Sequence, residues 1–172
     1  MKHFTEEFGK EVFSKLDPFG EISVDTNYDE RMAMLLICHV VNDFFNVAFP
    51  EPLRHGVNPD GLKLLIGLSN TLGYRLDQEL DNTGPAPFTV MVGEITMLIM
   101  ILEKIEEANE IIHLKFGSCI PSNLTEPLHE KIFETLRKSL NGSCYIKNPD
   151  SPDDSLFART TLAMIPAQGG VC

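Results

Sequence analysis

The chain has 172 residues, of which 43% are hydrophobic and 23% charged, a balance that indicates one globular domain rather than a disordered chain. It carries 25 Asp and Glu against 14 Lys and Arg, a formal net charge of -11, and shows no cluster of basic residues. We therefore expect no direct nucleic acid binding and no attachment to an anionic membrane, whereas the acidity favours a protein partner with a basic surface.

The N-terminal segment predicts an amphipathic helix that ends at Asp17 and Pro18. Acidic residues interrupt the apolar stretch that a signal peptide would need, so we expect a cytoplasmic protein whose four cysteines are free thiols. The stretch GEISVDT alternates in polarity, but it has only Ile22 and Val24 as apolar positions, and we expect a loop there. The apolar stripe of the first helix recurs every four positions: Phe4, Phe8, Val12 and Leu16.

A second helix is predicted over 28–48. Asn27 and Glu30 have the spacing of a capping box, in which the asparagine accepts a helix-end amide and the glutamate reaches back. The run MAMLLICHVV is apolar on every face except at His39, and it is far shorter than the roughly 20 residues that cross a bilayer. We therefore expect a buried core helix, with His39 as a hydrogen-bonded core or interface histidine and Cys38 as a small apolar filler.

Asn58 and Pro59 predict the start of a third helix, as its N-cap and first helical residue. Gly61, Gly67 and Gly73 indicate close helix contacts rather than a nucleotide loop, because the sequence contains no G-x-G-x-x-G or GK[ST] pattern. The segment DNTGPAPF, residues 81–88, then predicts a stiff loop between helices.

A fourth, long helix is predicted from about 87 to 115. Its first half is apolar on nearly every side, whereas the second half carries glutamates on one face. Two helices that are apolar all round exceed what one small core readily encloses, so we predict a two-fold homodimer. The seam of this helix alternates spacings of four and three, with one polar interruption: Met91, Ile95, Leu98, Leu102, Ile105, Asn109, Ile112 and Phe116.

Glu94 lies in the apolar half of this helix, and two interpretations are open. A buried carboxylate would have a raised pKa or need a cation such as Arg75, and either condition is common at functional sites. Alternatively, the side chain projects from the one open strip of the helix, which is the interpretation we favour.

A fifth helix is predicted from Asn123 or Thr125 to Leu140, with Asn141 and Gly142 as its stop. A short sixth helix is predicted from Ser151, as its N-cap, to about Met164. The predicted fold is all-α, a bundle of about six helices with those near 28–48 and 87–115 central. It forms one domain over 1–165, followed by a mobile C-terminal tail over 166–172.

Two Glu-x-x-His pairs flank the predicted turn between the fourth and fifth helices: Glu110 with His113, and Glu126 with His129. This spacing supplies half of the ligand set of ferritin-like di-metal bundles. The alternative is electrostatic, since Glu126 in a first helical turn and His113 in a last turn would each complement a helix dipole.

The glutamates of the fourth helix also have the E-x-x-E spacing of a magnesium site, in Glu103 with Glu106 and in Glu107 with Glu110. In these residues the chain resembles the all-α nucleotide pyrophosphohydrolases, although the E-x-x-D pair that completes their site does not follow. A metal-dependent helical enzyme is therefore the alternative function. Our main prediction is a non-enzymatic helical regulator without a cofactor, an adaptor, inhibitor or chaperone-like protein that binds its partner through an acidic or apolar helical surface. The predicted partner-binding residues are Glu103, Glu106, Glu107 and Glu110.

Overall fold

The computed structural model of the chain describes residues 3–48, 59–142, 145–146 and 155–164. The structure is 71% helical, with seven helices and one small sheet in these residues. This confirms the predicted all-α class and is compatible with a bundle of about six helices. In chain order the elements are α1 (Glu6–Lys15), β1 (Glu21–Thr26), α2 (Tyr28–Ala48), α4 (Pro59–Gln78), β2 (Ala86–Met91), α5 (Val92–Leu102), α6 (Ile105–Phe116), α7 (Ser122–Ser139), β3 (Tyr145–Ile146) and α8 (Ser155–Met164).

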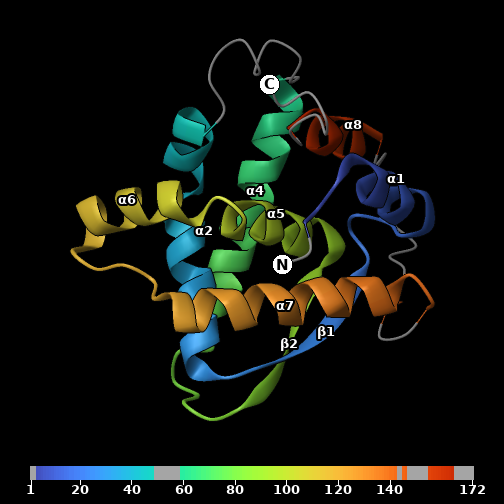
Figure 1. Cartoon of the computed structure of the whole chain (residues 1–172). Helices are drawn as coiled ribbons and strands as arrows, with labels where there is room; N and C mark the ends of the chain where they lie inside the picture. The colour runs from blue at the N-terminus through green and yellow to red at the C-terminus, as the bar shows by residue number, and fades with distance from the viewer. Residues whose placement is uncertain (1–2, 49–58, 143–144, 147–154, 165–172) are drawn as a thin grey trace.

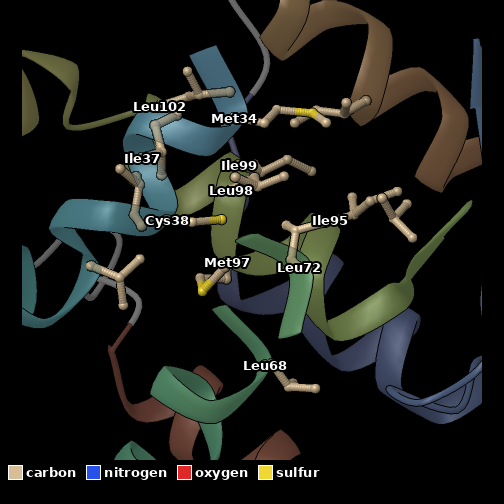
Figure 2. Close-up of a cluster of buried hydrophobic side chains, with 14 of the residues drawn as sticks. Met34, Ile37, Cys38, Leu68, Leu72, Ile95, Met97, Leu98, Ile99 and Leu102 are labelled. Atoms are coloured by element: carbon tan, nitrogen blue, oxygen red, sulfur yellow. The ribbon is translucent and has the colours of Figure 1, made fainter. Parts of the chain in front are cut away.

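Helix α5 is the central element of the fold. It contacts α2, α4, α6, α7 and β2, and ten of its eleven residues are buried. The apolar sides of α5, on which the homodimer prediction partly rested, are covered by other elements of the same chain. Figure 2 shows part of this core, where residues of α5 lie among those of α2 and α4: Met34, Ile37, Cys38, Leu68, Leu72, Ile95, Met97, Leu98, Ile99 and Leu102.

The predicted start of α2 is confirmed in detail. The Glu30 amide donates to Asn27 Oδ1 at 2.8 Å, and the Asn27 amide donates to Glu30 Oε1 at 2.9 Å. Both halves of the capping box are therefore formed, which satisfies two amides at the helix end. Lys131 of α7 also contacts Glu30 Oε1 at 2.7 Å, so the same carboxylate ties α7 to the start of α2.

The sequence interpretation was wrong at two strands. Residues 21–26, expected as a loop, form β1, and residues 86–91, expected as loop and helix start, form β2. The strands pair antiparallel, and their buried apolar residues share one face: Ile22 lies opposite Val90, and Val24 opposite Phe88. Each segment alone has only two such residues, so its strand character becomes apparent only when the partner, more than sixty positions away, is known.

The predicted helix over 87–115 is thus three elements, because the chain also breaks between α5 and α6. Lys104 has φ -122 and ψ 42, which is not helical, and α6 turns away from α5 to pack on α2 (Figure 1). Neither proline nor glycine occupies the break, so no local signal marks it. The seam with alternating spacing therefore runs over two separate helices rather than along one coiled coil.

Glycines in α4 mark close helix contacts, as predicted, at two of three positions. A Cβ at Gly61 would collide with the Thr160 side chain of α8, and one at Gly73 would lie 3.3 Å from Cys38 Cβ of α2. Gly67 has open space around it. The first two glycines therefore let α8 and α2 approach the α4 backbone.

The later helix ends agree with prediction. Helix α7 spans Ser122–Ser139, and Gly142 follows it with φ 85 and an amide that donates to Ser139 O at 2.9 Å. Helix α8 ends at Met164 as predicted. The N-caps predicted at Asn58 and Ser151, the boundary at 165 and the tail over 166–172 lie outside the described residues. None of the helices in the described ranges has the length and apolar character to cross a membrane.

Candidate functional site

Glu103, placed by sequence on an acidic helix face, points into the protein. Its carboxylate accepts the Phe4 amide at 2.9 Å and lies 3.0 Å from His129 Nε2 of α7 and 3.3 Å from His3 Nδ1. Because a carboxylate only accepts hydrogen bonds, His129 carries a proton on Nε2. Glu103 thus joins the N-terminal segment, the α5–α6 junction and α7, so it does not belong to an outward acidic face.

An aromatic row strengthens the same junction. Phe4 meets Phe8 edge to face at 5.5 Å, and Phe8 stacks on Phe133 of α7 at 4.9 Å between ring centroids. His129 stacks on Phe133 in turn, at 5.8 Å. The buried Phe4 ring and the Glu103 carboxylate together hold the start of the chain against α7.

The other three predicted glutamates lie on α6, away from its buried residues; Glu106 and Glu110 are exposed, and Glu107 is half-buried. Ala108 and Ile112 face the core, and α6 carries its C-terminal end away from the body of the molecule (Figure 1). The sequence analysis missed one residue of the outward side, Leu114, whose exposed fraction of 86% is the highest among the large exposed hydrophobic residues. Leu114 does not belong to the predicted seam of apolar residues, and this position could have indicated that its side chain is exposed. We call these outward residues the acidic face of α6: Glu106, Glu107, Glu110 and Leu114.

The turn that follows α6 is fixed by Asn109, the polar residue that interrupts the predicted seam. Its Oδ1 accepts the Ile120 amide at 2.9 Å, and its Nδ2 donates to Ile120 O at 3.0 Å. Gly117 ends α6 in the left-handed region, with φ 75. The end of α6 is therefore held in one conformation although residues 113–119 are all exposed.

The two Glu-x-x-His pairs are not brought together. Glu110, His113 and Glu126 are exposed, whereas His129 is buried and bonded to Glu103. No group of three His, Cys, Asp or Glu side chains within the described ranges is placed to hold a metal ion. The four residues therefore do not form one ligand set in the described part of the chain.

The electrostatic interpretation placed His113 in the last turn of one helix and Glu126 in the first turn of the next. It is right for α6 and wrong for α7. His113 lies in the last turn of α6, as expected. Helix α7, however, begins at Ser122, one residue before Asn123 and three before Thr125, so its first turn contains no acidic residue and Glu126 is its fifth residue. Pro127 is the sixth residue of α7 and lies inside the helix.

The glutamate pairs that resemble a magnesium site are also separated by the fold. Glu103 precedes α6 and is turned inward, whereas Glu106 is on the exposed side of that helix. The E-x-x-E spacing of Glu103 with Glu106 therefore does not place two carboxylates on one helix face. Glu107 and Glu110 lie on one side of α6, where Glu110 is exposed and Glu107 is half-buried.

Glu94 is fully buried. The interpretation that we favoured, a side chain projecting from an open strip of the helix, is therefore wrong. The alternative, a buried carboxylate beside a cation such as Arg75, is right. Its Oε1 lies 2.5 Å from Arg75 Nη2 and accepts the Met91 amide at 2.8 Å, while Oε2 accepts the Thr71 hydroxyl at 3.3 Å. Burial raises the pKa of this carboxyl above its ordinary value, and the hydrogen bond and charge of Arg75 oppose that rise. A buried carboxylate with a partly exposed cation is a feature that functional sites share with structural ion pairs.

The register of the sheet shows one structural role of Glu94. The Val92 amide donates to Gly20 O at 2.9 Å, so residues 88 and 90 of β2 direct their backbone groups toward β1. The backbone groups of residues 87, 89 and 91 then face the outer edge of the sheet.

Two of the backbone groups on this outer edge have side-chain partners, and a third position has no amide to offer. Pro87 has no N–H, Thr89 O accepts Arg75 Nη2 at 3.4 Å, and the Met91 amide donates to Glu94. Proline and charged side chains on an edge strand prevent it from pairing with another strand. The Glu94–Arg75 pair therefore has a structural use, closing the edge of β2 and the start of α5.

Of two neighbouring residues of α2, Cys38 has the environment that was predicted and His39 does not lie in the core. His39 is exposed rather than in the core, and its ring lies 5.8 Å from the ring of Phe116 on α6. Cys38 is the buried apolar filler that was predicted, and Figure 2 shows it among the core side chains. Burial raises the pKa of its thiol to about 12, which keeps it protonated and unreactive at neutral pH.

Arg31 is a buried charge that the sequence analysis did not single out. Its side chain is 1% exposed and donates to Thr26 O and Oγ1, both at 3.1 Å, and to Asn82 O and Gly84 O at 2.7 and 2.9 Å. It therefore fastens the loop before β2 to the start of α2. Arg31 directly precedes the apolar run MAMLLICHVV, and this position could have indicated a buried charge.

The chain matches no protein-family model, and neither the curated proteins nor the solved structures contain a chain that is significantly similar to it.

Proposed function

We propose that this protein is a non-enzymatic regulator, of the adaptor, inhibitor or chaperone-like kind, that binds a basic protein surface through the acidic face of α6. The observation that carries the proposal is the environment of Leu114, an 86% exposed leucine on the same side of α6 as three glutamates. Protein interfaces combine apolar contacts with a polar rim, and Leu114 with the glutamates beside it has this combination on a small scale. The net charge of -11 favours approach of a basic partner.

The contacts of the candidate metal ligands also support a non-enzymatic function over the metal-dependent alternative. Glu103 and His129 bind each other and the N-terminal segment, so both are engaged in holding the fold. The remaining members, Glu110, His113 and Glu126, are exposed on two different helices.

The experiment that tests the proposal compares capture of host proteins by three immobilised forms of the full chain. These are the wild type, a variant with Glu106, Glu107 and Glu110 changed to Gln, and a control with the exposed Glu6, Glu7 and Glu11 of α1 changed to Gln. We expect a partner with a basic surface to be retained by the wild type and the control, and lost from the α6 variant. Equal retention by all three forms would contradict the proposal.

Metal dependence is measured on the same protein. We expect thermal melts to be unchanged by added Mn, Fe, Zn or Mg. A melting temperature that rises with one of these metals would favour the metal-dependent enzyme instead.

The predicted homodimer and the cytoplasmic location belong to this proposal and rest on the sequence. Because α5 is enclosed within one chain, the interface of a dimer would lie on other elements. Light scattering that gives the monomer mass of 19.2 kDa at micromolar concentration would refute the dimer.

A further inference from the structure

We infer that the acidic face of α6 binds an amphipathic helix of the partner, with Leu114 as the apolar anchor and the glutamates as sites for Lys or Arg. This inference rests on the proposed function and specifies the shape and chemistry of the partner segment. Its basis is the spacing, exposure and rigidity of the side chains on α6.

The spacing suits a helix that packs alongside α6. Leu114 follows Glu110 by one helical turn and Glu107 by two, distances of about 6 and 10 Å along the axis. A partner helix with an apolar residue over Leu114 would therefore place basic residues one and two turns away. Charged residues that flank an apolar contact in this way determine which helices pair and in which register.

The rigidity of α6 lowers the cost of binding. The double hydrogen bond between Asn109 and Ile120 fixes the turn after α6, and the Lys115 ammonium donates to His39 O of α2 at 3.0 Å. The exposed end of α6 is thus tied to two other parts of the chain. A surface that is already ordered loses less conformational entropy when a partner docks.

Charge decides between the candidate occupants. A second copy of this chain brings the same net charge of -11 and the same glutamates, and nucleic acid brings phosphates. Both would add negative charge to a face that already carries Glu106, Glu107 and Glu110. A basic amphipathic helix supplies the opposite charge and an apolar stripe for Leu114.

A direct binding experiment uses a synthetic helix of about five turns with leucines on one stripe and lysines beside it. We expect it to bind the full-length wild type, and to bind about tenfold more weakly when salt is raised from about 0.05 to about 0.3 M. A peptide with glutamate in place of every lysine is the charge control. If this acidic peptide binds equally well, charge complementarity is refuted.

Four variants locate the binding site. Leu114→Ala and Glu110→Gln should each weaken peptide binding by about tenfold. The matched controls, Tyr74→Ala on α4 with a 68% exposed side chain and the exposed Glu126→Gln on α7, should leave it unchanged. Circular dichroism of each variant confirms that the fold is retained.

The remaining outcomes separate this inference from the proposed function. Binding that is unaffected by the α6 variants would overturn the helix site but leave a basic partner possible elsewhere. No binding of the lysine peptide to the wild type would overturn the inference, whereas the proposed function would be overturned by equal retention of host proteins in the capture experiment. A dimer that Leu114→Ala converts to a monomer would assign the face to a second copy and overturn the inference.

Discussion

The carboxylate of Glu94, fully buried at the start of α5, lies 2.5 Å from the guanidinium of Arg75 on α4. Arg75 is 35% exposed, so the pair connects the interior to the surface beside the edge strand β2. Removing one partner alone would leave the other charge without compensation.

Arg75→Met should lower the free energy of unfolding by about 2 to 4 kcal/mol at pH 7, because it leaves a buried carboxylate without its cation. Adding Glu94→Gln should recover part of that loss, since the variant then buries an amide instead of a charge. Urea denaturation measures both. The matched control is Arg137→Met, which breaks an exposed pair with Glu134 and should cost no more than about 1 kcal/mol.

Glu94→Gln should also change how stability depends on pH. Burial raises the pKa of the Glu94 carboxyl in the folded state, so above pH 4.5 the native state retains a proton that the unfolded state has lost. The contribution of Glu94 to stability is therefore present at low pH and lost as pH rises through its folded pKa. The free energy of unfolding of wild type minus that of the variant should fall as pH rises, by at most about 1.4 kcal/mol per pH unit.

Denaturation curves at pH 4, 5, 6, 7 and 8 provide the measurement. A difference that rises with pH would mean that attraction to Arg75 outweighs burial, and the assigned direction of the shift would be wrong.

Glu103→Ala should destabilise the protein by about 2 to 3 kcal/mol, because the charge-assisted bonds to the Phe4 amide and His129 are lost together. Hydrogen exchange at the Phe4 amide should become faster in the variant. Glu106→Ala, three positions away and exposed, is the control and should change stability by less than about 0.5 kcal/mol. Equal effects of the two substitutions would refute the internal role of Glu103.

The glycines of α4 should respond in opposite directions to alanine. Gly67→Ala should stabilise the protein by about 0.5 to 1 kcal/mol, because its site is open and alanine is the better helix former. Gly61→Ala should destabilise it by about 1 to 3 kcal/mol, because the new methyl group collides with Thr160. Thermal unfolding of both variants tests the packing of α8 on α4, and stabilisation by Gly61→Ala would contradict it.

The thiols should differ in reactivity. In a Cys144→Ser, Cys172→Ser background, a thiol reagent at pH 8 should label exposed Cys119 quickly. Cys38 should react only as the protein unfolds, because it is buried and its thiol pKa is raised to about 12. Rapid labelling of both cysteines in the native protein would show that the α2–α4–α5 core opens more readily than its packing indicates.

The sequence alone determined the features that depend on neighbouring residues. The Asn27 and Glu30 capping box, the stop at Gly142 and the extent of α2 were predictable because each arises from hydrogen bonds or periodicity within a few residues. The all-α class followed from the same helical periodicity. The acidity of the chain follows from its composition alone.

Tertiary structure decided the features that depend on residues distant in sequence. Strands β1 and β2 pair with each other although they are more than sixty positions apart in the sequence. The break before α6 is marked by no proline or glycine. For the candidate site, sequence grouped Glu103 with Glu106, Glu107 and Glu110, but the N-terminal segment and α7 draw its carboxylate inward. Whether a carboxylate is buried, as Glu94 is, depends on which other elements cover it, and that is fixed only when the chain folds.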